Sequence, residues 1–366
     1  MSEVSSAPLI ARGPVPSPPP SPSPVAYLVS QYPAPSHTFI RREVEALRKA
    51  GVRVDTFSVH QAPAEHLQSA IDREDAAQTF AILSQPLWAF PAAMLAAVIR
   101  NPGAFFSALL VALRLRPPGI RAFLLSLAHF AEALVLAREL RRRGISQLHN
   151  HFANSGATVG LLAARMIGIR WSFTIHGISE FDYPAGLTLP AKIAAAEFVA
   201  CVSWFGKAQA MRMVPTDQWH KLTVVRCGLD LTQLPVPTPH DSGRPTIICV
   251  GRLSPEKGHG GLFEALAMFA PDERPNLVLV GDGPQRAELA TLVDHHGLGG
   301  SVTFAGRKPE AETLEMIAAS DILVLPSFME GLPIVLMEAM ALGVGVVASV
   351  SASGLRPAKV TDPPRP

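Results

Sequence analysis

Short apolar runs alternate with amphipathic segments along most of this 366-residue chain, and the alternation occurs twice. In the first half, an apolar run at 25–29 precedes a helical pattern at 38–50, and a second run follows at 52–57. In the second half, five apolar runs begin at residues 246, 276, 301, 322 and 345, with helical patterns between them. Strands that alternate with helices in this way indicate parallel sheets covered on both faces. We therefore expect an α/β protein with two doubly wound domains.

Prolines mark the borders of these domains. The chain has 34 prolines, and nearly half of them lie in three stretches: the first 24 residues, residues 234–245 and the last ten residues. Such clusters are typical of tails and linkers. The expected segments are a disordered tail at 1–24, a first domain at 25–230, a linker at 231–245, a second domain at 246–349 and an aberrant tail at 350–366.

Composition excludes several classes of protein. With 48% apolar and 17% charged residues the chain can bury a large core, and a net charge of +2 provides no strong attraction to nucleic acid. The three cysteines have no metal-ligand spacing, so neither a disulfide framework nor a zinc site is expected. No basic stretch followed by an apolar one opens the chain, which favours a cytoplasmic protein.

The middle of the first domain contains a long apolar segment that begins at residue 76. Residues 76–99 carry no charge, and further apolar blocks follow, separated by arginines at 100, 114, 116 and 121. Three interpretations stay open: core helices of the first domain, a basic and apolar surface that lies on an anionic membrane, or a membrane-spanning helix.

Ligands of open parallel sheets bind beyond the carboxyl ends of the strands, so the residues that follow each strand are the candidate site residues. Gly251, Arg252 and Lys257 follow the run at 246–250, where two cations can face one anion. Gly281 and Gly283 follow the run at 276–280 and allow close approach of the backbone to a ligand.

A nicotinamide cofactor does not fit these loops. The acidic residue that a dinucleotide fingerprint places about 20 positions further on is missing. The run at 301–304 is followed instead by Arg307 and Lys308.

Two glutamates flank the start of a helix predicted over 333–342, with Pro333 in its first turn. The free N–H groups of that turn form an anion site. Glu330 lies just before the helix, and Glu338 lies in its second turn among apolar residues. A buried carboxylate needs a partner, and paired hydroxyls of a sugar or ribose can supply one.

These motifs carry a family resemblance. The Glu330–Glu338 spacing, Arg252 with Lys257 and the glycines at 281 and 283 occur in one order, and the segments 36–43, 149–152 and 174–177 add to the match. The chain resembles family 4 retaining glycosyltransferases with the GT-B fold, over about residues 25–349. It is most similar to the subgroup that makes bacterial exopolysaccharides such as colanic acid. The resemblance implies two Rossmann-like domains that face each other across a cleft.

The resemblance also implies roles for the residues of the second domain. Arg252 and Lys257 would neutralise the nucleotide diphosphate as it leaves, and Glu330 would contact the donor sugar. Glu338 would bind the ribose hydroxyls. The remaining donor-binding positions are Gly251, Gly281, Gly283, Arg307, Lys308, Gly331 and Leu332.

In the first domain, the resemblance places His176 at the cleft, near the transferred sugar. His37 and His151 would lie on the acceptor side, and for His151 a purely structural role stays open. The implied donor is a UDP- or GDP-sugar, and neither a metal nor another cofactor is expected. The implied acceptor is a lipid-linked oligosaccharide, reached from the cytoplasm or from the inner membrane surface.

The end of the chain departs from the family pattern. Residues 350–366 lack the strand and helices with which the family continues, so we expect a truncated second domain. Three functions therefore stay open: an active glycosyltransferase, an inactive relic or non-catalytic partner in a polysaccharide assembly complex, and another GT-B enzyme such as an epimerase or phosphorylase.

Overall fold

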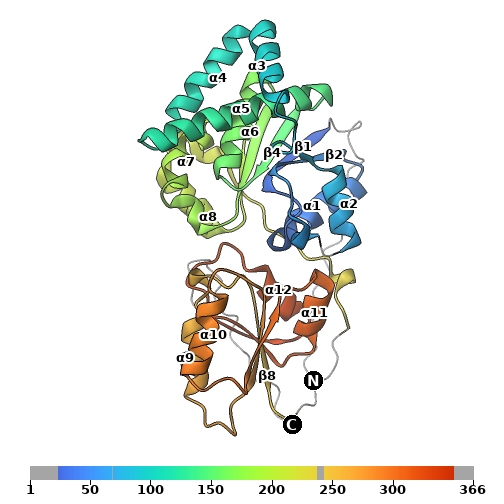
Figure 1. Cartoon of the computed structure of the whole chain (residues 1–366), viewed down its shortest axis with the longest axis vertical. Coiled ribbons are helices and arrows are strands. Elements are labelled where there is room, and N and C mark those ends of the chain that lie inside the picture. Colours follow the sequence, from blue (N-terminus) through green and yellow to red (C-terminus); the bar gives the residue numbers. More distant parts are fainter. Residues whose placement is uncertain (1–23, 68, 237–242, 350–366) are drawn as a thin grey trace, which may run out of the picture.

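Seven parallel strands form the sheet of the first domain, and five parallel strands form the sheet of the second. The computed structural model describes residues 24–67, 69–236 and 243–349, and Figure 1 shows the two domains stacked end to end. The α/β class with two doubly wound sheets is confirmed. The predicted tails at 1–24 and 350–366, apart from Pro24, lie outside the described residues, as does part of the predicted linker.

The first sheet has the strand order β3-β2-β1-β4-β5-β6-β7. Its strands are β1 (Val25–Gln31), β2 (Val54–His60), β3 (Phe80–Ala81), β4 (Gln147–His151), β5 (Arg170–Ile175), β6 (Val199–Cys201) and β7 (Leu222–Val224). Its helices are α1 (Thr38–Lys49), α2 (Ala70–Gln78), α3 (Ala89–Arg100), α4 (Pro102–Arg114), α5 (Ile120–Arg142), α6 (Ser155–Ile167), α7 (Ala185–Ala195) and α8 (Trp204–Met213).

The second sheet has the strand order β10-β9-β8-β11-β12. Its strands are β8 (Thr246–Val250), β9 (Asn276–Val280), β10 (Val302–Gly306), β11 (Ile322–Leu325) and β12 (Gly345–Ala348). Its helices are α9 (His259–Ala267), α10 (Arg286–His295), α11 (Glu310–Ala318) and α12 (Ile334–Ala341).

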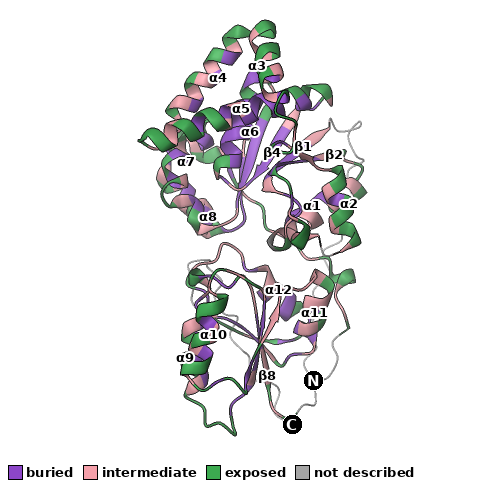
Figure 2. Ribbon diagram, in the orientation of Figure 1, coloured by how far each residue is buried: buried purple, intermediate pink, exposed green. Residues whose placement is uncertain are grey.

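Both sheets bury side chains on both faces, which explains why their strands read as continuous apolar runs. In β1, Ala26 and Leu28 face the core beneath α5 and α6, whereas Tyr27 and Val29 face the smaller core beneath α1. In the second domain, one core lies beneath α9 and α10 and another beneath α11 and α12. Figure 2 shows both sheets as mostly buried, with exposed residues on the outer helices.

Several predicted boundaries are wrong by one or two residues. Helix α12 begins at Ile334, so Pro333 is its N-cap residue rather than its first helical residue. Strand β10 runs to Gly306, two residues beyond the predicted end. Helix α10 begins at Arg286 instead of 284. Several short elements escaped prediction altogether: α2, α7, α8, β3, β6 and β7.

The apolar segment after the first domain's opening strands folds into helices rather than one continuous span. Residues 76–99 comprise the end of α2, the short β3, a turn and α3. Helix α5 alone, among the described residues, is long and apolar enough to cross a membrane, and 44% of its most apolar window is buried in the domain. The second half of α5, from Phe130 to Leu140, packs into the core of the first domain. The first three turns of α5 carry apolar residues on the outside, so no helical period marks the beginning of this helix in the sequence.

Candidate active site

The site residues lie where the strand order of each sheet reverses. The reversal falls between β1 and β4 in the first sheet and between β8 and β11 in the second. Ligands bind at such points, beyond the carboxyl ends of the strands. His37 and His151 follow or end strands of the first sheet at this point, and Arg252, Lys257 and Glu330 follow strands of the second.

Three histidines of the first domain form one cluster with two phenylalanines. His151 Nδ1 and His176 Nε2 are 2.9 Å apart, so one ring donates an N–H to the other. The rings of Phe39 and Phe152 each lie 4.7 Å from the ring of His176, and the His37 ring lies 5.1 Å from that of Phe152. The structure thus brings together all three predicted histidines.

Burial keeps these histidines neutral. It lowers the pKa of His176 to about 3 and that of His37 to about 4, and the positive charge of Arg252 across the domain boundary lowers the His37 pKa further. It also lowers the pKa of His151 well below its usual value. A neutral imidazole donates through one nitrogen and accepts through the other, so each ring can hold a hydroxyl but cannot supply a positive charge at neutral pH.

A buried carboxylate ties the ends of β4 and β5 together beneath the histidines. Glu180, in the 3-10 helix η3 (Ile178–Phe181), accepts hydrogen bonds from the backbone N–H groups of Ala153, His176 (2.6 Å) and Gly177 (2.7 Å). Burial raises the pKa of Glu180 to about 7, and the three N–H groups and the nearby Lys192 oppose that rise. The Lys192 ammonium donates to the Ala153 carbonyl at 2.7 Å. Glu180 and Lys192 therefore hold the backbone that follows β4 and β5, which carries the histidine cluster.

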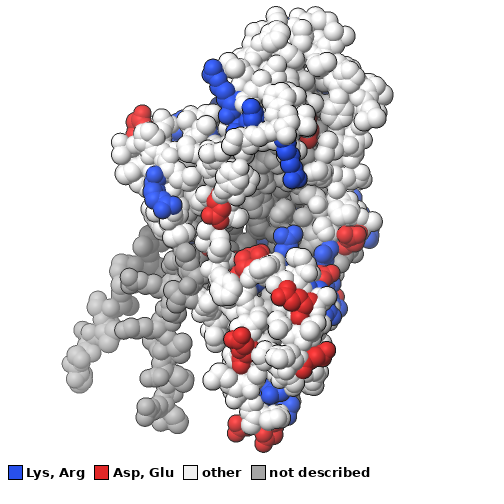
Figure 3. All heavy atoms as spheres, turned by 60° about the vertical axis from the view of Figure 1, so that its left-hand side comes forward, with Lys and Arg blue, Asp and Glu red and all other residues white. Residues whose placement is uncertain are grey.

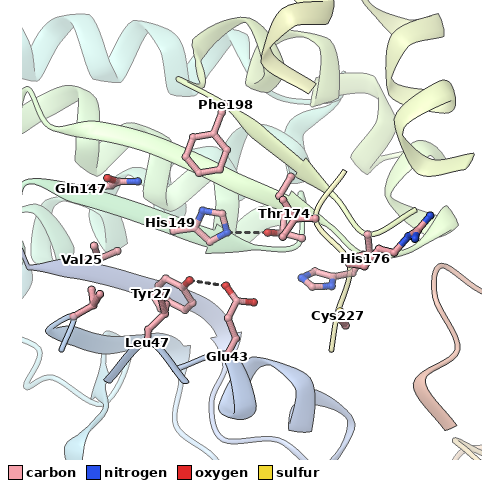
Figure 4. Close-up of a pocket in the computed structure, with 15 residues that line it drawn as sticks. Val25, Tyr27, Glu43, Leu47, Gln147, His149, Thr174, His176, Phe198 and Cys227 are labelled. Atoms are coloured by element: carbon pink, nitrogen blue, oxygen red, sulfur yellow. Dashed lines mark hydrogen bonds between the residues drawn. The ribbon is translucent and has the colours of Figure 1, made fainter. Parts of the chain in front are cut away.

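A cavity opens beside the cluster on the face of the sheet that α1 covers. Its volume is about 320 Å³, and Tyr27, Glu43, His149 and His176 are among the side chains that line it. Figure 4 shows these residues on β1, α1, β4 and after β5, with the Tyr27 hydroxyl donating to Glu43 at 2.6 Å. His149 uses both ring nitrogens, on Ser172 and Thr174, which indicates a structural role.

In the second domain, the loop after β8 places a cation on one of the predicted acids. Lys257 Nζ lies 2.6 Å from Glu330 Oε1, and both side chains are mostly buried. Arg252 is exposed at the end of the same strand, and its charge reaches His37. Lys257 and Glu330 therefore form a pair, whereas the sequence analysis assigned them to separate groups of the donor.

Gly281 and Gly283 lie against the loop that follows β8. A Cβ on Gly281 would lie 1.9 Å from the carbonyl oxygen of Gly251, and a Cβ on Gly283 would lie 2.4 Å from that of Leu253. Without side chains, the two glycines leave room for the neighbouring loop, which carries Arg252. The glycines act on the site by setting the position of that loop.

Charged side chains join the two domains at the edge of the site. Arg42, on α1, donates to Glu338 at 2.7 Å and also pairs with Glu310. Arg41 pairs with Glu310 and, at 3.2 Å, with Asp72. Burial raises the pKa of Glu338, and Arg42 lowers it. The Glu338 carboxylate, which was predicted to need a partner, is therefore paired with Arg42 of the opposite domain.

Backbone groups of the two domains also meet at Gly331. A Cβ at this position would lie 1.7 Å from the carbonyl oxygen of His176, so only glycine fits. The contact sets the loop between β11 and α12 directly against the histidine cluster. Residues of the two predicted half-sites thus become neighbours.

The remaining predicted residues lie around this junction. Leu332 is half-buried beside Gly331, and Arg307 is close enough to His66 of the first domain to lower its pKa. Lys308 pairs with Glu312 one turn further along the chain. Within the described part of the chain, no group of three or more His, Cys, Asp or Glu side chains is arranged to hold a metal ion.

Several residues that shape the site were not identified from the sequence. Glu180 and Lys192 carry no motif, and only their burial reveals them. Arg42 lies 296 positions before Glu338, so no local pattern connects the two. The adjacent Arg41 and Arg42 in the segment 36–43 were the one available signal.

Comparison with known proteins identifies the class. Residues 232–358 match the family described as glycosyl transferases group 1. The chain is 25% identical over 355 residues to the putative colanic acid biosynthesis glycosyltransferase WcaL of Salmonella typhimurium, covering 89% of this chain and 82% of the relative. It is 27% identical to the amylovoran biosynthesis glycosyltransferase AmsK of Erwinia amylovora, with the same coverage.

The fold has counterparts among solved structures. HepE of Anabaena, in complex with UDP and glucose, superposes with a TM-score of 0.66 at 16% identity, covering 90% of this chain and 81% of that one. Sequence and fold together define the chain as a glycosyltransferase with the GT-B fold.

The junction at Gly331 leads to a first prediction. Gly331→Ala should force the two domains apart, because its Cβ would overlap the His176 carbonyl. Small-angle scattering should then show a larger radius of gyration. Gly300→Ala is the matched control, since a Cβ there meets nothing within 4 Å. An unchanged scattering profile for Gly331→Ala would show that the contact does not hold the domains together.

The cradle around Glu180 leads to a second prediction. Glu180→Gln should lower the free energy of unfolding of the first domain by about 2 kcal/mol, because the amide NH₂ faces a backbone donor. All four tryptophans (Trp88, Trp171, Trp204 and Trp219) lie in that domain, so tryptophan fluorescence in urea reports its unfolding. The exposed Glu264→Gln should change stability by less than about 0.5 kcal/mol. Equal midpoints for all three proteins would contradict the assigned role.

Proposed function

We propose that this chain transfers a sugar from a UDP- or GDP-sugar to a hydroxyl of a lipid-linked oligosaccharide, with the anomeric configuration retained. The observation that carries the proposal is the junction at which Lys257 and Glu330 of one domain lie next to the His176 loop of the other. The names of the relatives support a polysaccharide product. The UDP and glucose held by HepE support a nucleotide-sugar donor.

In the proposed reaction, the main catalytic task is to stabilise the diphosphate leaving group. The bond between the anomeric carbon and the diphosphate oxygen breaks, and its electron pair stays on the diphosphate. Arg252 and Lys257 stabilise this growing negative charge, and in the proposed reaction they take the place of a divalent cation. Lys257 must turn from Glu330 toward the diphosphate, which frees the Glu330 carboxylate to accept from a sugar hydroxyl.

The first domain positions the sugar and the acceptor. His176 is neutral at physiological pH, so it holds a sugar hydroxyl by hydrogen bonding instead of donating a proton as an imidazolium. The acceptor oxygen bonds to the anomeric carbon and gives up its proton to solvent or to a neighbouring base. His37 and His151 border the space on the acceptor side, and the 320 Å³ cavity adds room beside them.

Glu338 has a proposed role in binding the ribose. Its carboxylate accepts a hydrogen bond from Arg42, and two ribose hydroxyls would share or replace this donor. Arg307 and Lys308 follow β10 next to this position, where their loop would contact the base. Gly251, Gly331 and Leu332 complete the proposed donor site through their backbone groups.

A donor screen is the direct test of the function. Purified full-length protein should transfer or hydrolyse at least one of a panel of UDP- and GDP-sugars, and the product should keep the anomeric configuration by nuclear magnetic resonance. A thermal-shift response without turnover would instead favour the non-catalytic alternative. Interconversion of the donor sugar without transfer would identify an epimerase.

The phosphate assignment leads to a third prediction. Arg252→Ala and Lys257→Ala should each lower turnover by about 10²–10³, because each removes a preorganised donor to the leaving group. The exposed Lys49→Ala, on α1, controls for the loss of a positive charge and should leave turnover unchanged. Unaltered turnover in both site variants would contradict the assignment.

The ribose assignment leads to a fourth prediction. Glu338→Gln should weaken binding of the nucleoside diphosphate by about tenfold in calorimetry, since a charged acceptor of two hydroxyls is lost. Glu310→Gln is the matched control, because Glu310 shares the Arg42 partner but has no assigned contact with the nucleotide. If both variants bind equally tightly, the carboxylate at 338 does not recognise ribose.

A further inference from the structure

Helices α3, α4 and the first turns of α5 expose large apolar side chains. We call this surface the apolar crest, defined by Trp88, Leu95, Ile99, Phe106, Ile120 and Leu124. Ile99 and Ile120 are 74% and 75% exposed, and Trp88, which precedes α3, is 66% exposed. The crest lies at the end of the first domain that points away from the second (Figure 1).

The crest reverses the usual pattern of a surface helix. In α4, the buried positions include the small Ala108 and Ala112, while the larger Phe106 and Leu110 point outward. In α3, Ala93 is buried and Leu95 and Ile99 are exposed. An amphipathic helix on a water-soluble protein has its polar side outside. A contiguous apolar patch of this kind marks a surface that meets a partner or a membrane.

The charges around the crest are of one sign. No acidic residue occurs between Asp75 and Glu132, whereas arginines stand at positions 100, 114, 116 and 121. Arg100 and Arg114 end α3 and α4, Arg121 lies in the first turn of α5, and all three are exposed. Figure 3 shows the upper lobe of the molecule as a wide surface without charged side chains, with basic groups along its lower edge.

This combination favours an anionic bilayer over a second copy of the chain. Two crests placed face to face would oppose arginine with arginine at the rim, with no acid of the same segment to offset them. Lipid phosphates at the edge of an acyl layer match both features, because apolar side chains enter the acyl boundary and arginines meet the headgroups. The second half of α5 packs into the core of the first domain, so only the first turns of this helix contribute to the crest.

We propose that the apolar crest seats the protein on the surface of an anionic bilayer, with Arg100, Arg114 and Arg121 on lipid phosphates. The second domain then points away from the membrane, where a water-soluble donor reaches it. The membrane contact does not depend on the proposed sugar transfer, and vesicle binding measures it without any substrate.

The test uses the full chain and vesicles of two compositions. The protein should sediment with vesicles of equal phosphatidylglycerol and phosphatidylcholine, and bind vesicles of phosphatidylcholine alone at least tenfold more weakly. Trp88 should shift its emission to shorter wavelength on binding. Trp88→Phe should remove most of that shift while the protein still sediments.

Substitutions on the crest locate the contact. Ile99→Glu and Phe106→Glu should each weaken vesicle binding about tenfold or more, as expected for the loss of one inserted apolar side chain. Arg114→Gln and Arg121→Gln should each weaken it about fivefold on anionic vesicles only. Met268→Glu, at an 87% exposed apolar position of the second domain, is the matched control and should bind like the unaltered chain.

Two outcomes would overturn the proposal. One is equal vesicle binding by the crest variants and the Met268→Glu control. The other is absence of binding to either vesicle together with a dimer, seen by light scattering, that the crest substitutions dissociate. Unchanged circular dichroism of the variants shows that altered binding does not arise from misfolding.

Discussion

The approach of Gly331 to the His176 carbonyl is the constraint on which the arrangement of the site depends. Each sheet brings its own loops to the carboxyl ends of its strands, but neither sheet alone holds both halves of a transferase site. A side chain at 331 would keep the loops apart. The contact also explains why Glu180 matters, since it fixes the backbone of the loop against which Gly331 packs.

Charge pairing is the second principle of the site. The carboxylates with proposed roles toward the donor, Glu330 and Glu338, pair with Lys257 and Arg42. A partly buried carboxylate without such a partner is costly. In the proposed reaction, a donor would exchange the partners of two carboxylates that are already largely desolvated, so their desolvation would not be an added cost of binding.

Most strands of the fold could be predicted because both faces of each sheet are buried. The runs at 246–250, 276–280, 322–325 and 345–348 coincide with β8, β9, β11 and β12. The beginning of α5 could not be predicted, because apolar residues on its exposed side remove the alternation of apolar and polar residues that marks a surface helix. The sequence also supported predicted roles for individual motif residues, but it did not show which of these residues pair with one another. Lys257 with Glu330 and Arg42 with Glu338 join residues from distant parts of the chain.

Helix α5 connects the apolar crest to the strand that carries His151. Helix α5 starts at the crest, runs into the core and leads to β4, which ends at His151. Both ends of this path belong to one packed domain with a continuous core. On a membrane, the reaction site would therefore stand at a fixed height above the lipid surface. An acceptor anchored in that membrane would be selected by its reach, so that glycans too short to extend along the domain would be poor substrates.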